Sequence, residues 1–201
     1  VGRYSRTGHS KRQDLAARIV TQSNASLSSA GQFRLHACGR VTEESFFRKC
    51  AALQSDSVRF DRDLPEADVS DLLARAGIYL HAGGLPHPFG EDPELCEHFG
   101  LSIIEAMGSG AIPIAYGRGG IVEVIRHGIS GFLYLDETDA VQCLLTIKLL
   151  SIDELQCLSD NAIVDAQRFT FDRFRDRIHP LVITLLSDYN PVVVGVCREG
   201  H

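Results

Sequence analysis

Short apolar runs alternate with stretches of helical periodicity along the first 135 residues of the chain. A short apolar run bounded by turn residues is typical of a buried strand, whereas apolar residues three and four positions apart are typical of a helix that buries one face. This alternation predicts an α/β fold with one doubly wound parallel sheet, covered by helices on both faces. The predicted strands are 33–39, 58–61, 78–82, 111–116 and 131–134, and the predicted helices are 10–29, 43–55, 66–76, 99–108 and 121–126.

Longer amphipathic patterns follow Asp136. They predict extra C-terminal helices over 137–151, 152–168 and 171–187, of which the last contains Pro180, a residue that breaks or kinks helices. The run 191–196 is typical of one more strand, which either belongs to this domain or starts a further segment. We therefore expect one domain over residues 1–188 and a C-terminal tail over 189–201. The chain starts without Met inside a strand-like run, which favours a piece of a longer protein.

The composition is that of an ordinary soluble globular protein, with 44% hydrophobic and 23% charged residues. No apolar run approaches the roughly 20 residues that cross a bilayer, and the N-terminal residues lack the apolar core of a signal peptide. The six cysteines show no CxxC pair and no metal-ligand spacing, which favours reduced thiols over a disulfide framework. These features predict a cytoplasmic protein.

The distribution of charge is more informative than its sum. A net charge of −6 argues against general nucleic-acid binding, which requires a basic surface. The first 18 residues nevertheless carry five cations against one acid, Asp14. This basic cluster is either a binding site for a small polyanion or a solvated helix face. Its members are Arg3, Arg6, Lys11, Arg12 and Arg18.

The segment 97–110 carries the most specific pattern. Glu97 and Glu105 lie eight positions apart, and between them a Phe-Gly-Leu turn opens an apolar helix. A helix start among glycines leaves backbone N–H groups unpaired, and these groups together with the helix dipole favour an anion such as phosphate. Carboxylates before and inside the helix can accept sugar or ribose hydroxyls. This combination indicates a nucleotide-sugar site.

The same pattern resembles the retaining glycosyltransferases of family 4, which have two Rossmann-like domains (the GT-B fold) and a signature of two glutamates separated by seven residues. Five landmarks carry the resemblance, which extends from Val1 to about Leu135. They stand in the family's order: the first strand of its C-terminal domain at 1–3, its phosphate-binding lysine at Lys11, the glutamate pair, and two later loops at 119–123 and 127–133.

The resemblance implies the C-terminal, donor-binding domain of a glycosyltransferase. Such a domain binds a nucleoside-diphosphate sugar (a UDP-, GDP- or ADP-sugar), and the whole enzyme passes the sugar to a hydroxyl acceptor in polysaccharide or glycoconjugate synthesis. The family needs no metal and no cofactor besides this substrate. Its N-terminal acceptor domain is absent from this sequence, so we expect the chain alone to bind the donor without turnover. Membrane association, common in the family, would come from the absent part.

The resemblance also assigns roles to individual residues. Arg3 and Lys11 are implied as cations that neutralise the leaving diphosphate. Seven residues separate them, a longer loop than the family pattern has, so that Arg12 or Arg6 could take the place of Lys11. The N–H groups of Phe99, Gly100 and Leu101 are implied as donors to phosphate. Glu105 is implied as the carboxylate that binds ribose, and Glu97 as the one that binds the sugar, with no nucleophilic role assigned to it. His81 is a candidate sugar contact.

Each of these residues also has an ordinary structural interpretation. Arg3 and Lys11 could form a surface pair, Glu97 could be a helix N-cap acid, and a single histidine such as His81 is more often structural. Glu105 could lie on a helix surface, but its apolar neighbours favour partial burial beside a partner.

Three further features complete the sequence predictions. The loop 83–96 contains glycines and prolines and could form a lid or shape the sugar or acceptor pocket. The pair Asp61 and Asp63 resembles a divalent-metal motif, but no third ligand is evident, so we predict no metal there. Glu123 follows a glycine pair at a helix start, where it improves the helix dipole.

Two other functions remain compatible with the pattern. One is a nucleotide-sugar epimerase or phosphorylase of similar fold, which would release free epimerised sugar or sugar phosphate. The other is a non-catalytic module that binds a nucleotide sugar. Product analysis of the full protein separates the first, and tight nucleotide binding without activity on any donor would favour the second.

Overall fold

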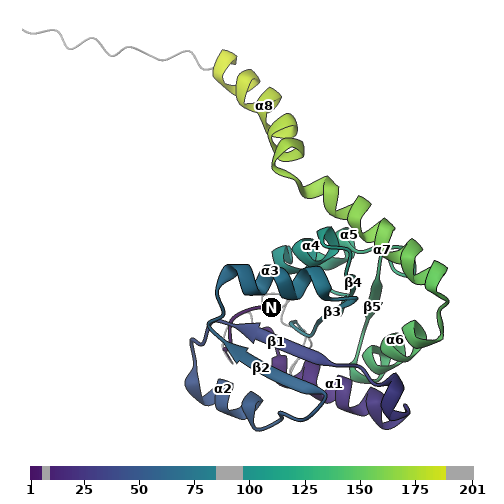
Figure 1. Cartoon of the computed structure of the whole chain (residues 1–201). Helices are drawn as coiled ribbons and strands as arrows, with labels where there is room; N and C mark the ends of the chain where they lie inside the picture. Colours follow the sequence, from purple (N-terminus) through teal and green to yellow (C-terminus); the bar gives the residue numbers. More distant parts are fainter. Residues whose placement is uncertain (6–9, 85–96, 189–201) are drawn as a thin grey trace, which may run out of the picture. The chain divides into compact units, whose positions relative to one another are not determined.

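The computed structural model describes residues 1–5, 10–84 and 97–188 of the chain. These residues fall into two compact units, of which the first runs from Val1 to Gln167 and the second begins at Arg168. The first unit is an α/β domain in which strands are enclosed by helices (Figure 1). Among the described helices, none has both the length and the apolar character that crossing a membrane requires.

All strand pairs in the described residues are parallel, as the sequence predicts, but the strands form two sheets. In one sheet, β1 (Leu35–Gly39) pairs with β2 (Val58–Arg62), and Leu35 lies opposite Val58. In the other, the order is β3–β4–β5, with Ile78 opposite Ile112 and Ile114 opposite Phe132. The bounds of its strands are Ile78–His81 for β3, Ile112–Tyr116 for β4 and Phe132–Tyr134 for β5. The predicted α/β class is confirmed, whereas the single continuous sheet is replaced by two parallel ones.

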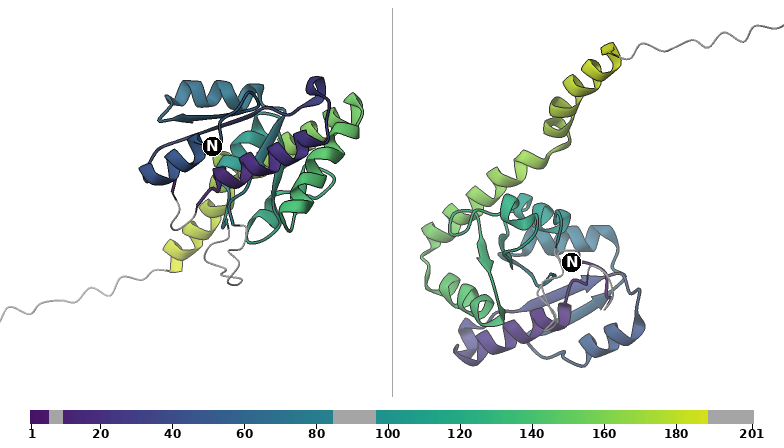
Figure 2. Two further views of the ribbon diagram at one scale, coloured as in Figure 1. Left: turned by 90° about the horizontal axis from the view of Figure 1, so that it is seen from below. Right: turned by 180° about the vertical axis from the view of Figure 1, so that it is seen from behind.

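Helices cover these strands in two layers (Figure 1, Figure 2). Within one layer α1 contacts both α2 and α6, and within the other α4 contacts both α3 and α7. Coverage of both faces explains why all five residues of β4 are buried. The helices are α1 (Gln13–Ala25), α2 (Glu44–Ala51), α3 (Glu66–Arg75), α4 (Leu101–Gly108), α5 (Ile121–Val124), α6 (Glu137–Leu149) and α7 (Ile152–Ala166), and short 3-10 turns occur at Ser29–Gly31 and Gln167–Phe169.

Two apolar clusters form the core of this domain. The larger one joins α1, α6 and α7 to β4 and β5, with Ile19, Ile114 and Leu144 among its buried side chains. The smaller one packs α1 and α2 on β1 and β2 around the fully buried Tyr4. The hydroxyl of Tyr4 donates to the carbonyl oxygens of Ala37 and Asp61, at 3.0 and 3.1 Å. Tyr4 therefore anchors the N-terminal segment to the end of the small sheet.

Several boundaries differ from the predictions for local reasons. The first helix begins at Gln13 rather than near residue 10, because Arg12 takes a left-handed conformation with a φ of 48°. The segment Val1–Arg3, expected as a strand, is not part of either sheet: the N–H of Gly2 donates to Cys38 O, and only Tyr4 forms a ladder bridge, to Val41.

The second unit contains one long helix, α8 (Phe171–Asp188). It continues through Pro180 without the break that the sequence suggests. Pro180 has no backbone N–H to donate, and the loss of this one hydrogen bond does not end the helix. The C-terminal tail 189–201, including the predicted strand 191–196, lies outside the described residues, as do Arg6 and most of the loop 83–96.

The start of α7 carries a complete capping box, which gives the first testable expectation. Ser151 Oγ accepts from the N–H of Glu154 at 3.2 Å, and Glu154 Oε2 accepts from the N–H of Ser151 at 2.7 Å. Replacing an N-cap serine by alanine costs about 1 kcal/mol. We expect Ser151→Ala to lower the free energy of unfolding by about that amount in urea titrations. The exposed Ser70→Ala, inside α3, is the control; equal stability of the two variants would contradict the cap.

Candidate functional site

Several segments meet beyond the C-terminal end of β3, the edge where parallel α/β sheets place their ligand sites. β3 ends at His81, and the segment that begins at Glu97 leads into α4. The N–H of Gly120, from the loop after β4, donates to the carbonyl oxygen of Glu97 at 3.1 Å. The backbone of Ser10 lies beside Gly83, because a Cβ at that glycine would be 3.1 Å from Ser10 O. Loops far apart in sequence therefore converge there.

Three polar side chains from these segments form one cluster. The ammonium of Lys11 and the carboxylate of Glu97 make an ion pair, although 86 positions separate them in the chain. His81 Nε2 lies 3.3 Å from Oε2 of the same carboxylate. The side chains of Lys11, Glu97 and His81 are 23%, 15% and 3% exposed, so the cluster opens to solvent from its lysine end. The structure thus brings together three of the residues that the sequence selects.

The surroundings fix the charges of this cluster. Contact with His81, and then with Lys11, outweighs partial burial and holds the pKa of Glu97 far below its usual range. Burial lowers the pKa of His81, more than the neighbouring carboxylate raises it. At neutral pH the site therefore contains an ionised Glu97 and a neutral His81. A neutral imidazole has one N–H to donate and one nitrogen to accept.

His81 is held rigidly in this place. The hydroxyl of Tyr134 donates to its carbonyl oxygen at 2.8 Å. A Cβ at Gly83 would lie 2.8 Å from His81 Cε1, so that only glycine lets the backbone pass the imidazole ring. Within the described part of the chain, both ring nitrogens of His81 are buried without a hydrogen-bond partner, so Nε2 meets Glu97 by proximity rather than by a hydrogen bond of good geometry.

The start of α4 lies against the same cluster. Gly100 is the residue before the helix and has a φ of 78°, a conformation that favours glycine. Gly120 packs directly on the segment before the helix, because a Cβ there would come within 1.8 Å of His98 O. Phe99 and Leu101 are 46% and 65% exposed. Gly100 itself is buried, and the two glycines thus set the approach of the chain to α4. The phosphate-binding role of Phe99, Gly100 and Leu101 stays a prediction.

Glu105 corrects one expectation. It is exposed rather than partly buried, because Ile103, Ala106 and Met107 form the buried face of α4 and Glu105 lies on the opposite face. Apolar neighbours in sequence do not bury a residue on a helix that turns about 100° at each step.

The other predicted cations lie near the cluster without joining it. The side chain of Arg3 is exposed, while its carbonyl oxygen accepts from Gln13 Nε2 at 3.0 Å. Arg12 Nε lies 3.4 Å from Asp14 Oδ1, and the other oxygen of Asp14 accepts from Lys49 at 2.7 Å. Lys11 is therefore the cation that the described residues place on Glu97.

Gln13 is a positioning residue that the sequence did not indicate. Its buried amide nitrogen donates to the carbonyl oxygens of both Gly2 and Arg3, at 3.1 and 3.0 Å. These bonds join the start of α1, two residues after Lys11, to the N-terminal segment. A glutamine in a helical pattern has no motif that would reveal this role.

The acidic pair after β2 is engaged by cations. Burial opposes ionisation of Asp61, but contacts with His36, at 2.5 Å, and Arg59, at 2.9 Å, outweigh it and lower its pKa. Asp63 lies 3.4 Å from the neighbouring Arg62 Nε. In the described residues no group of three acidic, histidine or cysteine side chains could hold a metal ion. Metal independence stays a prediction.

The charges of the cluster predict a pH dependence of stability. Both His81 and Glu97 have lowered pKa values in the folded state, so each contributes stability above its unfolded pKa that is lost as the pH falls. The loss begins below about 6.5 for His81 and below about 4.3 for Glu97. We expect the free energy of unfolding in urea to decline between pH 7 and 5.5, and His81→Phe to remove this decline.

Glu97→Gln is expected to cost about 2 kcal/mol at pH 7, because it removes the charged acceptor of two contacts, and less at pH 4. His179→Asn, on α8, is the control and keeps the wild-type profile. A decline that persists in His81→Phe would contradict the burial of a neutral imidazole.

Two curated relatives match part of this chain. Over 97 residues the chain is 38% identical to a sucrose synthase of Acidithiobacillus caldus. The aligned region covers 43% of this chain and 12% of that protein. Over 121 residues it is 27% identical to the human GDP-Man:Man(3)GlcNAc(2)-PP-Dol alpha-1,2-mannosyltransferase. The aligned region covers 58% of this chain and 22% of that protein. The chain thus spans less than a quarter of either relative.

Solved structures show the same fold at low sequence identity. A glycosyltransferase from Rickettsia africae superposes with a TM-score of 0.73 at 17% identity, over 94% of this chain and 48% of that one. HepE of Anabaena, in complex with UDP and glucose, superposes with a TM-score of 0.70 at 20% identity, over 91% of this chain and 47% of that one. The model of the family described as glycosyl transferases group 1 matches residues 1–163. The chain therefore belongs to the group 1 glycosyl transferases.

Proposed function

We propose that this chain is the donor-binding domain of a retaining glycosyltransferase of family 4, and that it binds a nucleoside-diphosphate sugar. One observation carries the proposal: Lys11, Glu97 and His81 converge beside the glycine-rich start of α4. A cation and helix N–H groups suit a diphosphate, and an ionised carboxylate beside a neutral imidazole suits sugar hydroxyls. The two kinds of group stand next to each other, as the two parts of such a donor require.

In the proposed complex, the diphosphate replaces Glu97 as the partner of Lys11. The pair is only partly buried, so Lys11 can turn toward solvent without carrying its charge through the core. Glu97 keeps its contact with His81 and accepts hydroxyl groups of the sugar. During transfer, negative charge grows on the diphosphate, and Lys11 with the N–H groups of Phe99, Gly100 and Leu101 stabilises it. Metal is not needed for this neutralisation.

The exposed residues around the cluster have roles in the same complex. Glu105 faces solvent on α4 and is free of burial, so a ribose can approach it. Arg3 is likewise exposed on the N-terminal segment, and Arg12 stands at the start of α1. We assign ribose binding to Glu105 and additional phosphate binding to Arg3 and Arg12. We assign no nucleophilic role to Glu97.

The named ligands of relatives support this donor class. Solved structures of HepE contain UDP or UDP-glucose, and the name of the human mannosyltransferase contains GDP-Man. The relatives thus differ in base and sugar while sharing a nucleoside diphosphate. Because this chain spans about half the length of those solved structures, we propose that an acceptor-binding domain completes the enzyme. We also propose that the protein works in the cytoplasm, since its cysteines favour reduced thiols.

Calorimetric titration tests the proposal. UDP, GDP and ADP and their glucose and mannose conjugates are each added to the chain, and we expect one base series to bind. Lys11→Met should weaken binding of the nucleoside diphosphate ten- to hundredfold, because a charge-assisted contact contributes about 1.5–3 kcal/mol. It should leave binding of the uncharged nucleoside unchanged. Lys148→Met, on α6, is the matched control.

Two further variants separate the parts of the donor. Glu105→Ala should weaken all ligands that contain ribose, and Glu97→Gln should remove only the gain in affinity that the sugar adds to the nucleotide. Circular dichroism verifies folding of each variant. Binding that Lys11→Met does not change, or the same loss in Lys148→Met, would contradict the proposed site.

A further inference from the structure

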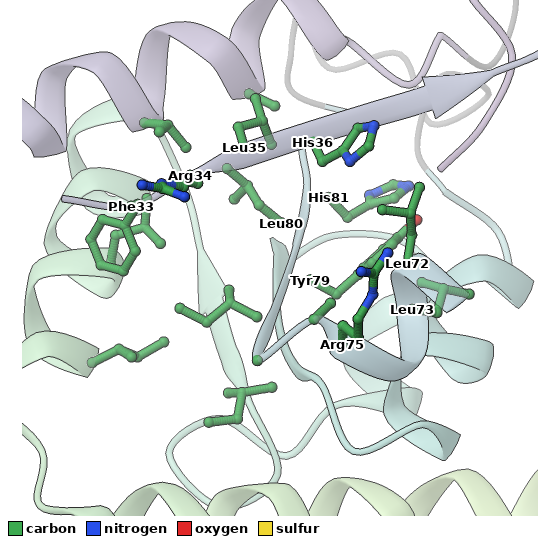
Figure 3. A pocket seen from close by; sticks show the side chains of 18 of the residues that line it. Phe33, Arg34, Leu35, His36, Leu72, Leu73, Arg75, Tyr79, Leu80 and His81 are labelled. Atoms are coloured by element: carbon green, nitrogen blue, oxygen red, sulfur yellow. The ribbon is translucent and has the colours of Figure 1, made fainter. Parts of the chain in front are cut away.

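His81 is a buried titratable side chain at the edge of the proposed donor site. Its imidazole is 3% exposed at the end of β3, and it lines the cavity shown in Figure 3 together with Tyr79 and Leu80 of the same strand. Within the described part of the chain neither ring nitrogen has a hydrogen bond, although Nε2 lies 3.3 Å from Glu97 Oε2. Buried polar groups nearly always have a partner. The contact between His81 and Glu97 is therefore one that a change of charge can strengthen.

Two basic groups approach the same oxygen of Glu97. The ammonium of Lys11 and Nε2 of His81 both meet Oε2. A positive charge beside an imidazole disfavours its protonation, and Lys11 accordingly lowers the pKa of His81, adding to the larger effect of burial. His81 therefore stays neutral as long as Lys11 is paired with Glu97.

Departure of Lys11 would leave Glu97 without its cation. The side chain of Glu97 is 15% exposed, and a largely buried charge without a partner is costly. A proton from the solvent restores the balance, either on the carboxylate or on the imidazole. The imidazole is the stronger base, since the ordinary pKa is about 6.5 for histidine and about 4.3 for glutamate. The proton therefore binds to the lone pair of a ring nitrogen of His81, after which both ring nitrogens are donors.

We propose that His81 takes up a proton from the solvent when a phosphate group of the donor draws Lys11 away from Glu97. The imidazolium then replaces the ammonium as the cation beside Glu97, and its Nε2–H donates to Oε2. Glu97 stays ionised and still accepts hydroxyl groups of the sugar. The inference rests on the proposed function, because the diphosphate of the donor is the group that moves Lys11.

The other titratable groups on the strand side of His81 do not take this role. The α-amino group of Val1 opposes protonation of His81 less than Lys11 does. The hydroxyl of Tyr134 donates to the carbonyl oxygen of His81, and burial raises the pKa of this phenol and of Tyr79. Both tyrosines are therefore neutral throughout the range in which an imidazole titrates.

The second histidine of the cavity has an acid of its own. His36, on β1, also lines the cavity in Figure 3, and its Nε2 lies 2.5 Å from Asp61 Oδ2. Its charge therefore depends on Asp61 rather than on Glu97. Among the residues that the structure describes, Glu97 is the acid and Lys11 the cation that control the protonation of His81.

Histidine NMR without nucleotide tests the competition for Glu97. Imidazole resonances of the wild type and of Lys11→Met are titrated with pH, and the His81 resonance is assigned by its absence from His81→Phe. We expect the midpoint of His81 to rise by about one pH unit or more in Lys11→Met, because this variant removes a nearby like charge. Lys148→Met, on α6, is the matched control and keeps the wild-type midpoint. Equal midpoints in the wild type and Lys11→Met would overturn the inference.

Calorimetry tests the same coupling in the wild type. The ligand is a nucleotide sugar, because its phosphates, unlike the terminal phosphate of a free nucleoside diphosphate, do not titrate near neutral pH. The enthalpy of binding is measured in PIPES and in Tris, two buffers of different ionisation enthalpy, and the difference gives the number of protons taken up. We expect roughly 0.3–1 proton per bound donor near pH 7, and an affinity that rises as the pH falls from about 8 to about 6.5.

The outcomes separate the two proposals. His81→Phe is expected to abolish the proton uptake; uptake that persists in this variant would overturn the assignment to His81, as would donor binding by the wild type without any uptake. A chain that binds none of the donors contradicts the proposed function. The titration without nucleotide still decides whether Lys11 and a proton on His81 compete for Glu97.

Discussion

The ion pair between Lys11 and Glu97 is the interaction on which the arrangement of the site depends. It joins the loop before α1 to the segment before α4, and its partners are 86 positions apart. Parallel strands place both segments at one edge of the domain, but the fold alone does not bring two loops into contact. The opposite charges of Lys11 and Glu97 bring the two loops into contact, and the buried His81 lies beside Glu97. In the proposed complex, the same charges bind the donor.

In the proposed complex, this arrangement separates the two tasks of a donor site. Glu97 is ionised and His81 neutral at neutral pH, and His81 Nε2 lies 3.3 Å from the carboxylate. Lys11 lies at the more exposed end and is the group that can change partners. A rigid, buried pair for neutral hydroxyls and a movable cation for phosphate match the two halves of a nucleotide sugar.

The sequence predicted most of the fold because hydrophobic periodicity survives wherever helices cover a sheet on both faces. β4, with five buried residues, follows directly from its apolar run. The sequence also selected Lys11, Glu97 and His81, which the structure brings together. Lys11 and Glu97 came from the family resemblance and His81 from its place at the end of a predicted strand, and their binding roles stay predictions. The exposure of Glu105 was missed because burial depends on helix phase rather than on neighbours in sequence. The role of Gln13 depends on contacts with the backbone of Gly2 and Arg3, which no side-chain pattern records.

The most direct measurement is a crystal structure of the protein with the nucleoside diphosphate that it binds. The account predicts that the diphosphate lies within hydrogen-bond distance of Lys11 Nζ and of the N–H groups at the start of α4, with Glu97 still in contact with His81. A nucleotide bound elsewhere on the domain, with Lys11 still paired to Glu97, would contradict it.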